Sequence, residues 1–280
     1  MIKAILSKIV FLLSLKQEEF SGSIKNRSDS DNGSYLSAVS KINRNYKHFA
    51  GFKKNATYRQ ILEHVSFQQG VDYIEIIEKQ NNLVFKNIGK LSLNDLVGNP
   101  DLFDFKFGKF SPTSLRYGKV ASDLEEIFGA NFGKNLVEIG VGYGGQALLL
   151  DQFYDIDKYL LVDLQEVLNL ASKYLDHHLL NLAYDTKTIN RIEKEDTWDL
   201  AISNYAFSEL PKNLQLLFVE KVLKNSKRGY LTMNSGNSET GRDFNKLSLS
   251  ELREVLPDFE VVEEKPPTYD GNYIIVWGHK

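Results

Sequence analysis

The glycine-rich segment Val137–Gly145 is the part of the sequence whose residue types and spacing point most directly to chemistry. It follows an apolar run and precedes a stretch with the pattern of a helix. Glycine permits a sharp turn and lets a ligand approach the main chain closely, and the free N–H groups at the start of a helix favour an anion or another hydrogen-bond acceptor. The segment therefore predicts a nucleoside cofactor bound where a strand turns into a helix.

The glycine spacing fits two classes of cofactor. Gly140, Gly142 and Gly145 satisfy G-x-G-x-x-G, the dinucleotide fingerprint. With Gly144 in the third place the same turn reads G-x-G-x-G, the form found in class I methyltransferases. Glu138, two residues before the first glycine, favours the second interpretation, in which its carboxylate helps to hold the methionine part of S-adenosylmethionine.

A second acidic residue follows about 20 positions later, as cofactor-binding sheets of this kind require. Asp163 directly follows the apolar run Tyr159–Val162, and its two acceptor oxygens suit the two vicinal hydroxyls of a ribose. The alternative is that Asp163 caps the helix expected to begin at Leu164, and both roles can hold together. We expect Asp163, Leu164 and Tyr143 to contact the cofactor.

The stretch 198–210 combines an apolar strand with a polar and aromatic loop. Ligands of open α/β sheets sit at the carboxyl ends of strands, so Ser203 and Asn204 are expected beside the methionine part of the cofactor. A hydroxyl that attacks a methyl group needs a base for its proton and correct placement. Glu209 is the predicted base and Tyr205 the predicted orienting residue; the alternative for Glu209 is a helix cap or a surface carboxylate.

Four further residues are candidates for the same site. Arg116 can bind the cofactor carboxylate through two hydrogen bonds, or form an ion pair between domains, and Tyr117 follows it. Asn234 ends an apolar run and is expected to bind substrate. His64 is an alternative base, although a single histidine on a helix is more often structural.

These residues need a layered scaffold, and the chain from residue 119 onward has the pattern of one. Strand-like and helix-like runs alternate, which is typical of a sheet covered by helices on both faces. The expected strands are 136–139, 159–162, one within 182–189, 200–203 and 230–233, and the expected helices are 120–128, 146–153, 164–175, 213–223 and 249–255. Glu260–Glu264 and Tyr273–Trp277 are joined too closely for a crossover and must pair antiparallel.

The residues before this domain form two expected regions. Residues 1–20 contain an apolar segment shorter than the roughly 20 residues that span a membrane, so we expect a packed or peripheral amphipathic helix, with weak contact to an anionic lipid surface as the alternative. Residues 21–118 are expected to form a mostly helical cap, which begins with a polar linker, Ser21–Asn45. Within the cap we expect helices over 58–63 and 73–79 and a short strand over 83–88.

Composition excludes several function classes. The net charge of −3 argues against a nucleic-acid partner, because phosphate binding needs a basic surface. The absence of cysteine excludes disulfides, zinc–thiolate sites and a cysteine nucleophile. The five histidines show no metal-ligand spacing, and no Asn/Asp-Pro-Pro-Tyr motif of amino-group methylation is present.

The sequence resembles the sugar O-methyltransferases of bacterial surface-polysaccharide gene clusters over about Tyr46 to the C-terminus. The resemblance lies in Val137–Gly145, Tyr159–Asp163, Ser203–Leu210 and Gly229–Asn234, with support from Ser111–Tyr117 and Gly271–Gly278. It implies a Rossmann-like class I methyltransferase sheet that ends in an antiparallel hairpin. It also implies S-adenosylmethionine as cofactor, a sugar or glycan as substrate and a cytoplasmic enzyme, with any membrane contact peripheral. A nicotinamide-dependent oxidoreductase and a non-catalytic cofactor-binding protein stay open as alternatives.

Overall fold

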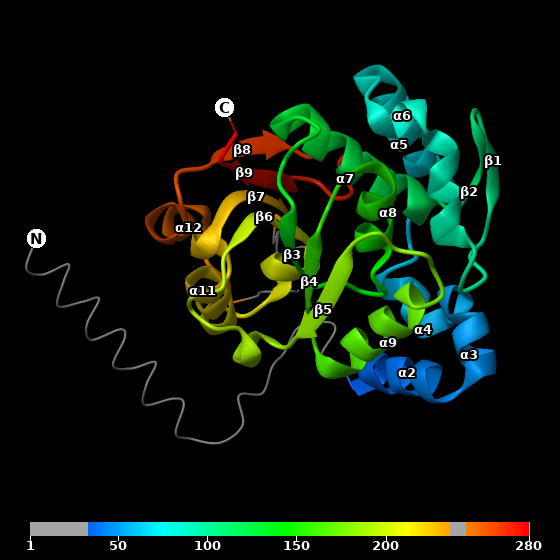
Figure 1. Cartoon of the computed structure of the whole chain (residues 1–280), viewed down its shortest axis with the longest axis horizontal. Helices are drawn as coiled ribbons and strands as arrows, with labels where there is room; N and C mark the ends of the chain where they lie inside the picture. Colours follow the sequence, from blue (N-terminus) through cyan, green and yellow to red (C-terminus); the bar gives the residue numbers. More distant parts are fainter. Residues whose placement is uncertain (1–32, 236–244, 280) are drawn as a thin grey trace, which may run out of the picture.

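A seven-stranded sheet forms the centre of the computed structural model, which describes residues 33–235 and 245–279. The strand order is β5-β4-β3-β6-β7-β9-β8 (Figure 1). The strands are β3 Asn135–Ile139, β4 Lys158–Val162, β5 Ala183–Lys187, β6 Trp198–Asn204, β7 Ser226–Met233, β8 Glu260–Glu263 and β9 Tyr273–Trp277. The first five are parallel, whereas β9 runs antiparallel to both β7 and β8. The predicted Rossmann-like α/β sheet with a terminal hairpin is confirmed.

Helices cover both faces of the sheet because its strands are apolar on both sides. Successive side chains of a strand point to opposite faces, and on β3 Leu136 belongs to one buried cluster while Val137 belongs to the other. The helices that follow the cap are α7 Pro112–Phe128, α8 Gly145–Phe153, α9 Gln165–Leu175, α10 Ala206–Glu209, α11 Lys212–Lys221 and α12 Leu249–Val255. Helices α11 and α12 lie on one side of the sheet, and α7, α8 and α9 lie on the other (Figure 1).

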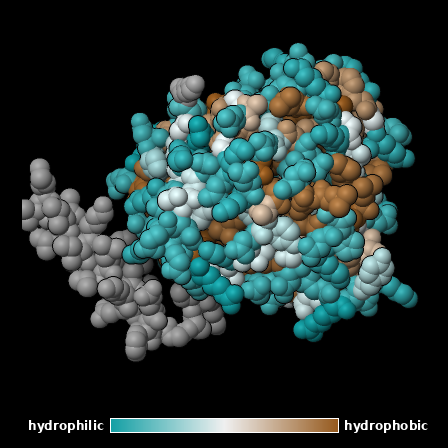
Figure 2. Space-filling view, viewed as in Figure 1, coloured by the Kyte–Doolittle hydropathy of each residue, from teal (hydrophilic) through white to brown (hydrophobic). Residues whose placement is uncertain are grey.

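The N-terminal elements pack onto the side that carries α7, α8 and α9. They are α2 Gly33–Arg44, α3 Tyr46–Ala50, η2 Phe52–Lys54, α4 Ala56–Ile61, α5 Phe67–Gln80, α6 Leu83–Lys86, η3 Ile88–Asp95 and the hairpin β1 Phe103–Phe105 with β2 Gly108–Phe110. Their buried side chains form one continuous cluster with those of the sheet. Figure 2 shows apolar side chains exposed on the same side of the molecule. Among residues 33–235 and 245–279, none of the helices could span a lipid bilayer.

The expected polar linker is partly wrong, because Gly33–Arg44 forms helix α2. Tyr35, Val39 and Ile42 recur at helical spacing and are at most 2% exposed, so one apolar stripe is buried although the segment is polar elsewhere. Near the C-terminal end of α2 the Asn43 side chain donates to the Glu166 carbonyl at 2.8 Å. The helix expected within residues 1–20 lies outside the described residues.

Two further expectations are corrected by local capping. The strand expected over 83–88 is instead helix α6, which starts where the Asn82 side chain accepts a hydrogen bond from the Val84 N–H at 3.2 Å. Helix α7 begins at Pro112 rather than at 120, because Ser111 caps it and proline is favoured in a first helical turn. The hairpin β1–β2 was not expected from the sequence.

Packing at the antiparallel edge yields a stability prediction. Gly229 on β7 lies opposite Trp277 on β9, and a Cβ atom added at Gly229 would lie 2.0 Å from the indole ring. We therefore expect Gly229→Ala to destabilise the fold by about 1–3 kcal/mol through overpacking, measured as a lower urea midpoint. Gly89→Ala is the control, since no atom lies within 4 Å of its added Cβ. Equal midpoints for the two variants would contradict the prediction.

Candidate functional site

The glycine turn lies where β3 ends and α8 begins, as the sequence predicts. Gly140, Gly142 and Gly144 have φ values of 77°, 55° and 87°, a left-handed region that residues with side chains rarely adopt. The turn is also crowded: a Cβ atom at Gly140 would lie 1.9 Å from the Cβ of Ala206. Backbone conformation and close packing therefore both require glycine here.

Asp163 fastens this turn to the neighbouring strand. Its Oδ2 accepts a hydrogen bond from the Val141 N–H at 2.8 Å, and its Oδ1 accepts one from the Leu164 N–H at 2.7 Å. Leu164 is the N-cap residue of α9, and no side chain caps that helix. The carboxylate thus holds the backbone on both sides of the expected cofactor position and does not act as an N-cap.

Glu138 lies below the turn, at 2% exposure. The Tyr159 hydroxyl donates to its Oε2 at 2.9 Å. Burial raises the pKa of the Glu138 carboxyl to about 8, and the nearby Asp163 adds to the rise while the bond from Tyr159 opposes it. The free protein therefore keeps a proton on Glu138 at neutral pH.

The end of β6 lies beside the turn. The Ser203 hydroxyl donates to the Ile139 carbonyl at 2.9 Å and accepts from the Phe207 N–H at 3.1 Å, so it joins β6 to β3. The Asn204 amide donates to Gln146 at 3.4 Å, but its buried Oδ1 has no hydrogen-bond partner.

Tyr205 follows with a φ of 69°, a conformation that costs a residue with a side chain about 1–3 kcal/mol. Its N–H donates to the Thr232 carbonyl at 3.0 Å, and its hydroxyl donates to the carboxylate of Glu264, which is 4% exposed. Sequence reasoning missed Glu264, because it lies some 60 positions away and no motif surrounds it.

Glu209 and Asn234 are brought together at the ends of α10 and β7. The Asn234 amide donates to Glu209 Oε1 at 3.0 Å, and the Lys246 ammonium donates to the Asn234 carbonyl at 2.7 Å. The Asn272 amide, from the loop before β9, lies 3.5 Å from Asn234 Oδ1. This arrangement places carboxylate and amide groups side by side at the carboxyl end of the sheet.

Helix α7 contributes Arg116, which is 7% exposed. Its Nη2 donates to the Leu62 carbonyl at 3.3 Å, while its Nε has no hydrogen-bond partner. The Leu62 side chain in turn lies 3.1 Å from the position of a Cβ at Gly142. Arg116 is therefore close to the glycine turn, as a cofactor-binding role would require.

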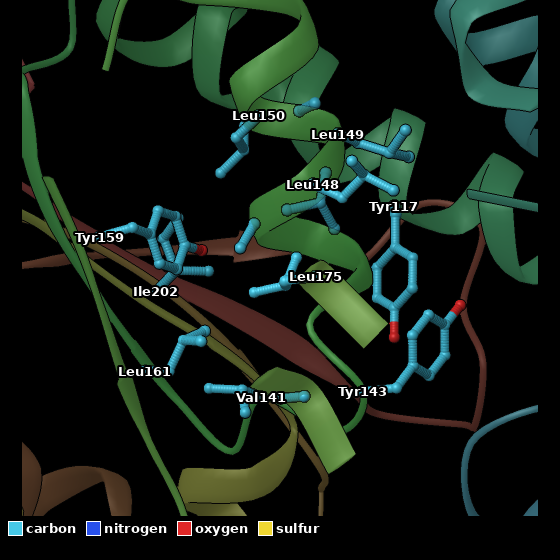
Figure 3. Packing of buried hydrophobic residues seen from close by; sticks show 14 of the residues in the cluster. Tyr117, Val141, Tyr143, Leu148, Leu149, Leu150, Tyr159, Leu161, Leu175 and Ile202 are labelled. Atoms are coloured by element: carbon cyan, nitrogen blue, oxygen red, sulfur yellow. The ribbon is translucent and has the colours of Figure 1, made fainter. Parts of the chain in front are cut away.

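Two tyrosines of the predicted site lie deeper than expected. Tyr143 is fully buried: its hydroxyl accepts from the Asn94 amide at 2.9 Å, and the Lys53 ammonium lies 4.3 Å from its ring centre. The ring of Tyr117 lies 5.9 Å from that of Tyr143 (Figure 3). A cofactor contact from Tyr143 would therefore come from its backbone.

His64 is exposed in the middle of the loop between α4 and α5. The dense protein around the imidazole, followed by the Arg116 guanidinium, lowers its pKa to about 4 although solvent reaches the residue. The imidazole is therefore neutral at neutral pH but a weak base. Its neighbour Glu63 has a buried Oε1 without a hydrogen-bond partner, and burial raises the pKa of the Glu63 carboxyl.

Unpartnered buried polar atoms are concentrated around this site. Eight such side-chain atoms occur in the part of the chain that the structure describes, and five belong to residues near the turn and Arg116. These five are Tyr58 Oη, Glu63 Oε1, Tyr73 Oη, Arg116 Nε and Asn204 Oδ1. Because an unsatisfied buried group costs about 1–3 kcal/mol, a cluster of both donors and acceptors indicates the place of a polar ligand.

A cavity of about 400 Å³ lies elsewhere, at the opposite ends of the strands. Asn135, Lys158, Ala183 and Trp198 line it, and these are the first residues of β3, β4, β5 and β6. Ligands of open parallel sheets bind at the carboxyl ends, so this cavity is not the candidate site.

Comparison with known proteins gives similarity in structure only. No protein-family model matches the sequence, and no curated protein matches it significantly. Magnesium protoporphyrin IX methyltransferase of Synechocystis PCC 6803, solved with bound S-adenosylmethionine, is 13% identical over 73% of this chain and 95% of its own, with a TM-score of 0.45. The methyltransferase domain of bacterial CtHen1 is 14% identical over 57% of this chain and 96% of its own, with a TM-score of 0.42. Similarity at this level says nothing about what the chain binds.

Proposed function

We propose that this chain is an S-adenosylmethionine-dependent O-methyltransferase that methylates a sugar hydroxyl in bacterial surface glycan biosynthesis. The observation that carries the proposal is the cluster of unpartnered buried polar atoms around a glycine turn at the carboxyl ends of the strands. S-adenosylmethionine offers ribose hydroxyls, an amino group and a carboxylate to such a cluster.

The residues present fit this cofactor. Asp163 lies beside the turn, and a carboxylate can accept several hydrogen bonds at once, so it suits the ribose hydroxyls. Arg116 has an unpartnered Nε for the cofactor carboxylate. Glu138 and Asn204 are the groups for the methionine part of the cofactor. Glu138 carries a proton at neutral pH that it can lose when the cofactor ammonium lies near it, and Asn204 has a buried acceptor oxygen without a partner.

The acceptor side supports a polyhydroxylated substrate. Glu209, Asn234, Thr268, Asn272 and Glu264 form a continuous hydrogen-bonded row at the carboxyl ends of β6 and β7. Amide, hydroxyl and carboxylate groups are the side chains that bind sugar hydroxyls in both directions. A row of this length suits a sugar better than a small acceptor with one hydroxyl.

Bound S-adenosylmethionine supplies an electrophilic methyl group, and the protein must present a hydroxyl oxygen to it and take up the proton. We assign the proton to Glu209 and the orientation of the acceptor to Tyr205. His64 is the weaker candidate for the base because its pKa of about 4 gives it little driving force.

Cofactor binding tests the proposal directly. Titration calorimetry should show saturable binding of S-adenosylmethionine, with NAD and NADP unable to compete. If the cofactor ammonium lies near Glu138, its positive charge lowers the raised pKa of the Glu138 carboxyl. Cofactor binding at pH 7 then releases up to about one proton from Glu138. The release is read from titrations in buffers of different ionisation enthalpy. Glu138→Gln should abolish it, and preferential binding of NAD would overturn the proposal.

Asp163 provides a second prediction. Asp163→Ala removes the acceptor for the ribose and both backbone hydrogen bonds, so we expect cofactor affinity to fall about 10-fold or more. Asp185→Ala is a matched control, because its carboxylate likewise accepts the N–H of the next residue, at 2.8 Å, but lies exposed on β5. A folded Asp163→Ala protein with unchanged affinity would leave Asp163 a purely structural role.

Glu209 provides a third prediction. Glu209→Gln keeps the shape of the side chain but is far less basic, so methyl transfer should slow by roughly 10²-fold or more, with cofactor affinity nearly unchanged. Release of S-adenosylhomocysteine, measured in a single turnover with a panel of methyl glycosides and nucleotide-linked hexoses, gives the rate. Glu220→Gln, on the exposed side of α11, is the control. Normal turnover in Glu209→Gln would remove this residue from the mechanism.

A further inference from the structure

Glu264 forms the end of a hydrogen-bonded network at the carboxyl end of the sheet. It follows β8 and is 4% exposed. Its carboxylate accepts a bond from the Tyr205 hydroxyl, one from the Thr268 N–H at 3.0 Å and one from the Thr268 hydroxyl at 2.9 Å. Three donors therefore converge on one buried acceptor.

The direction of each hydrogen bond in this network follows from its neighbours. The Ser235 N–H donates to Asn272 Oδ1 at 2.9 Å, which fixes the Asn272 amide so that its NH₂ group faces Thr268. That group donates to Thr268 Oγ1 at 2.9 Å. The single hydroxyl proton of Thr268 then goes to Glu264, because a bond to a carboxylate is stronger than a bond to a neutral phenol.

Tyr205 is left with one defined orientation of its hydroxyl. A carboxylate can only accept, so the phenol proton points at Glu264. Thr268 Oγ1 lies 3.1 Å from Tyr205 Oη, but its proton is used elsewhere. Within the residues that the structure describes, the phenol oxygen therefore receives no hydrogen bond and keeps its acceptor capacity.

The position of Tyr205 makes this acceptor relevant to the site. It directly follows β6 beside the glycine turn, and its φ of 69° is held in spite of the cost of that conformation. The Arg116 guanidinium and the Tyr73 hydroxyl are close enough to influence its charge state. The hydrogen-bonded row runs on from Glu264 through Thr268 to Glu209, the proposed base.

We infer that Glu264 is a positioning residue that holds the Tyr205 hydroxyl in one direction, so that the phenol oxygen accepts a hydrogen bond from a second hydroxyl of the methyl-accepting substrate. This inference rests on the proposed function. An alcohol has only one proton, so the reacting hydroxyl gives it to Glu209, and Tyr205 must bind a different one. The substrate is therefore a polyol with a free hydroxyl near the methylation position.

The test combines variants with substrate analogues. For the glycoside that the wild-type protein methylates best, kcat/KM is compared with that of each of its monodeoxy analogues, in wild type, Tyr205→Phe, Glu264→Gln and Glu263→Gln. We expect removal of one non-reacting hydroxyl to cost the wild-type protein about 3- to 10-fold, the scale of one hydrogen bond. The same removal should cost Tyr205→Phe nothing further. Glu263→Gln, which is exposed, should behave as wild type.

A spectroscopic measurement tests the pair without any acceptor. The ¹³Cζ resonance of Tyr205 is assigned by its loss in Tyr205→Phe and compared between variants by NMR at pH 7. The chemical shift of this carbon depends on the hydrogen bond that the phenol donates, so Glu264→Gln, which replaces a carboxylate acceptor with a neutral amide, should move it and Glu263→Gln should not.

The outcomes separate this inference from the proposed function. A protein that binds no S-adenosylmethionine refutes the proposed function, and the NMR comparison at pH 7 still reports on the Tyr205–Glu264 bond. A protein that binds the cofactor and methylates a glycoside, but shows the same deoxy penalties in Tyr205→Phe as in wild type, refutes the inference alone. An unchanged ¹³Cζ shift of Tyr205 in Glu264→Gln also refutes it.

Discussion

The hydrogen bond from the Val141 N–H to the Asp163 carboxylate is the contact on which the arrangement of the site depends. A turn with three left-handed glycines has many alternative conformations in the unfolded chain, and fixing it costs more backbone entropy than fixing other residues. Asp163 contributes to that fixation by binding the turn to the end of β4, and Ala206 adds to it by packing against Gly140. Strand ends β3, β4 and β6 are therefore locked together at one point.

The cap supports the same turn from behind. Tyr143 extends from the turn into a cluster of aromatic rings, where Tyr117 and Tyr174 meet it edge to face. Lys53, at 2% exposure, places its ammonium over the Tyr143 ring, and burial lowers the pKa of that ammonium. A cation held over an aromatic face in a low-dielectric interior is attracted more strongly than one in water, so the cap and the turn are coupled electrostatically as well as by packing.

The features that could be predicted from the sequence are those whose signals lie close together along the chain. Alternating apolar runs gave every strand of the large sheet, and the glycines with Asp163 gave the turn, because each signal lies within a few residues. Helix α2 was missed because only one stripe of its surface is apolar. That stripe stabilises the helix only when it is buried against other elements such as α9, which the local sequence does not reveal. Glu264 was missed for a related reason: its partner Tyr205 is distant in sequence, and only the antiparallel hairpin brings the two together.

Two buried carboxyl groups with different surroundings divide the site into two halves. Glu138 is 2% exposed and has one hydroxyl donor, so burial dominates and its proton is retained. Glu264 is 4% exposed and receives three hydrogen-bond donors. The first group can therefore respond to a cation placed over the glycine turn by losing a proton. The second fixes the direction of neighbouring hydroxyls, so the cofactor half of the site has a group that responds to charge and the substrate half has a group that orients the acceptor.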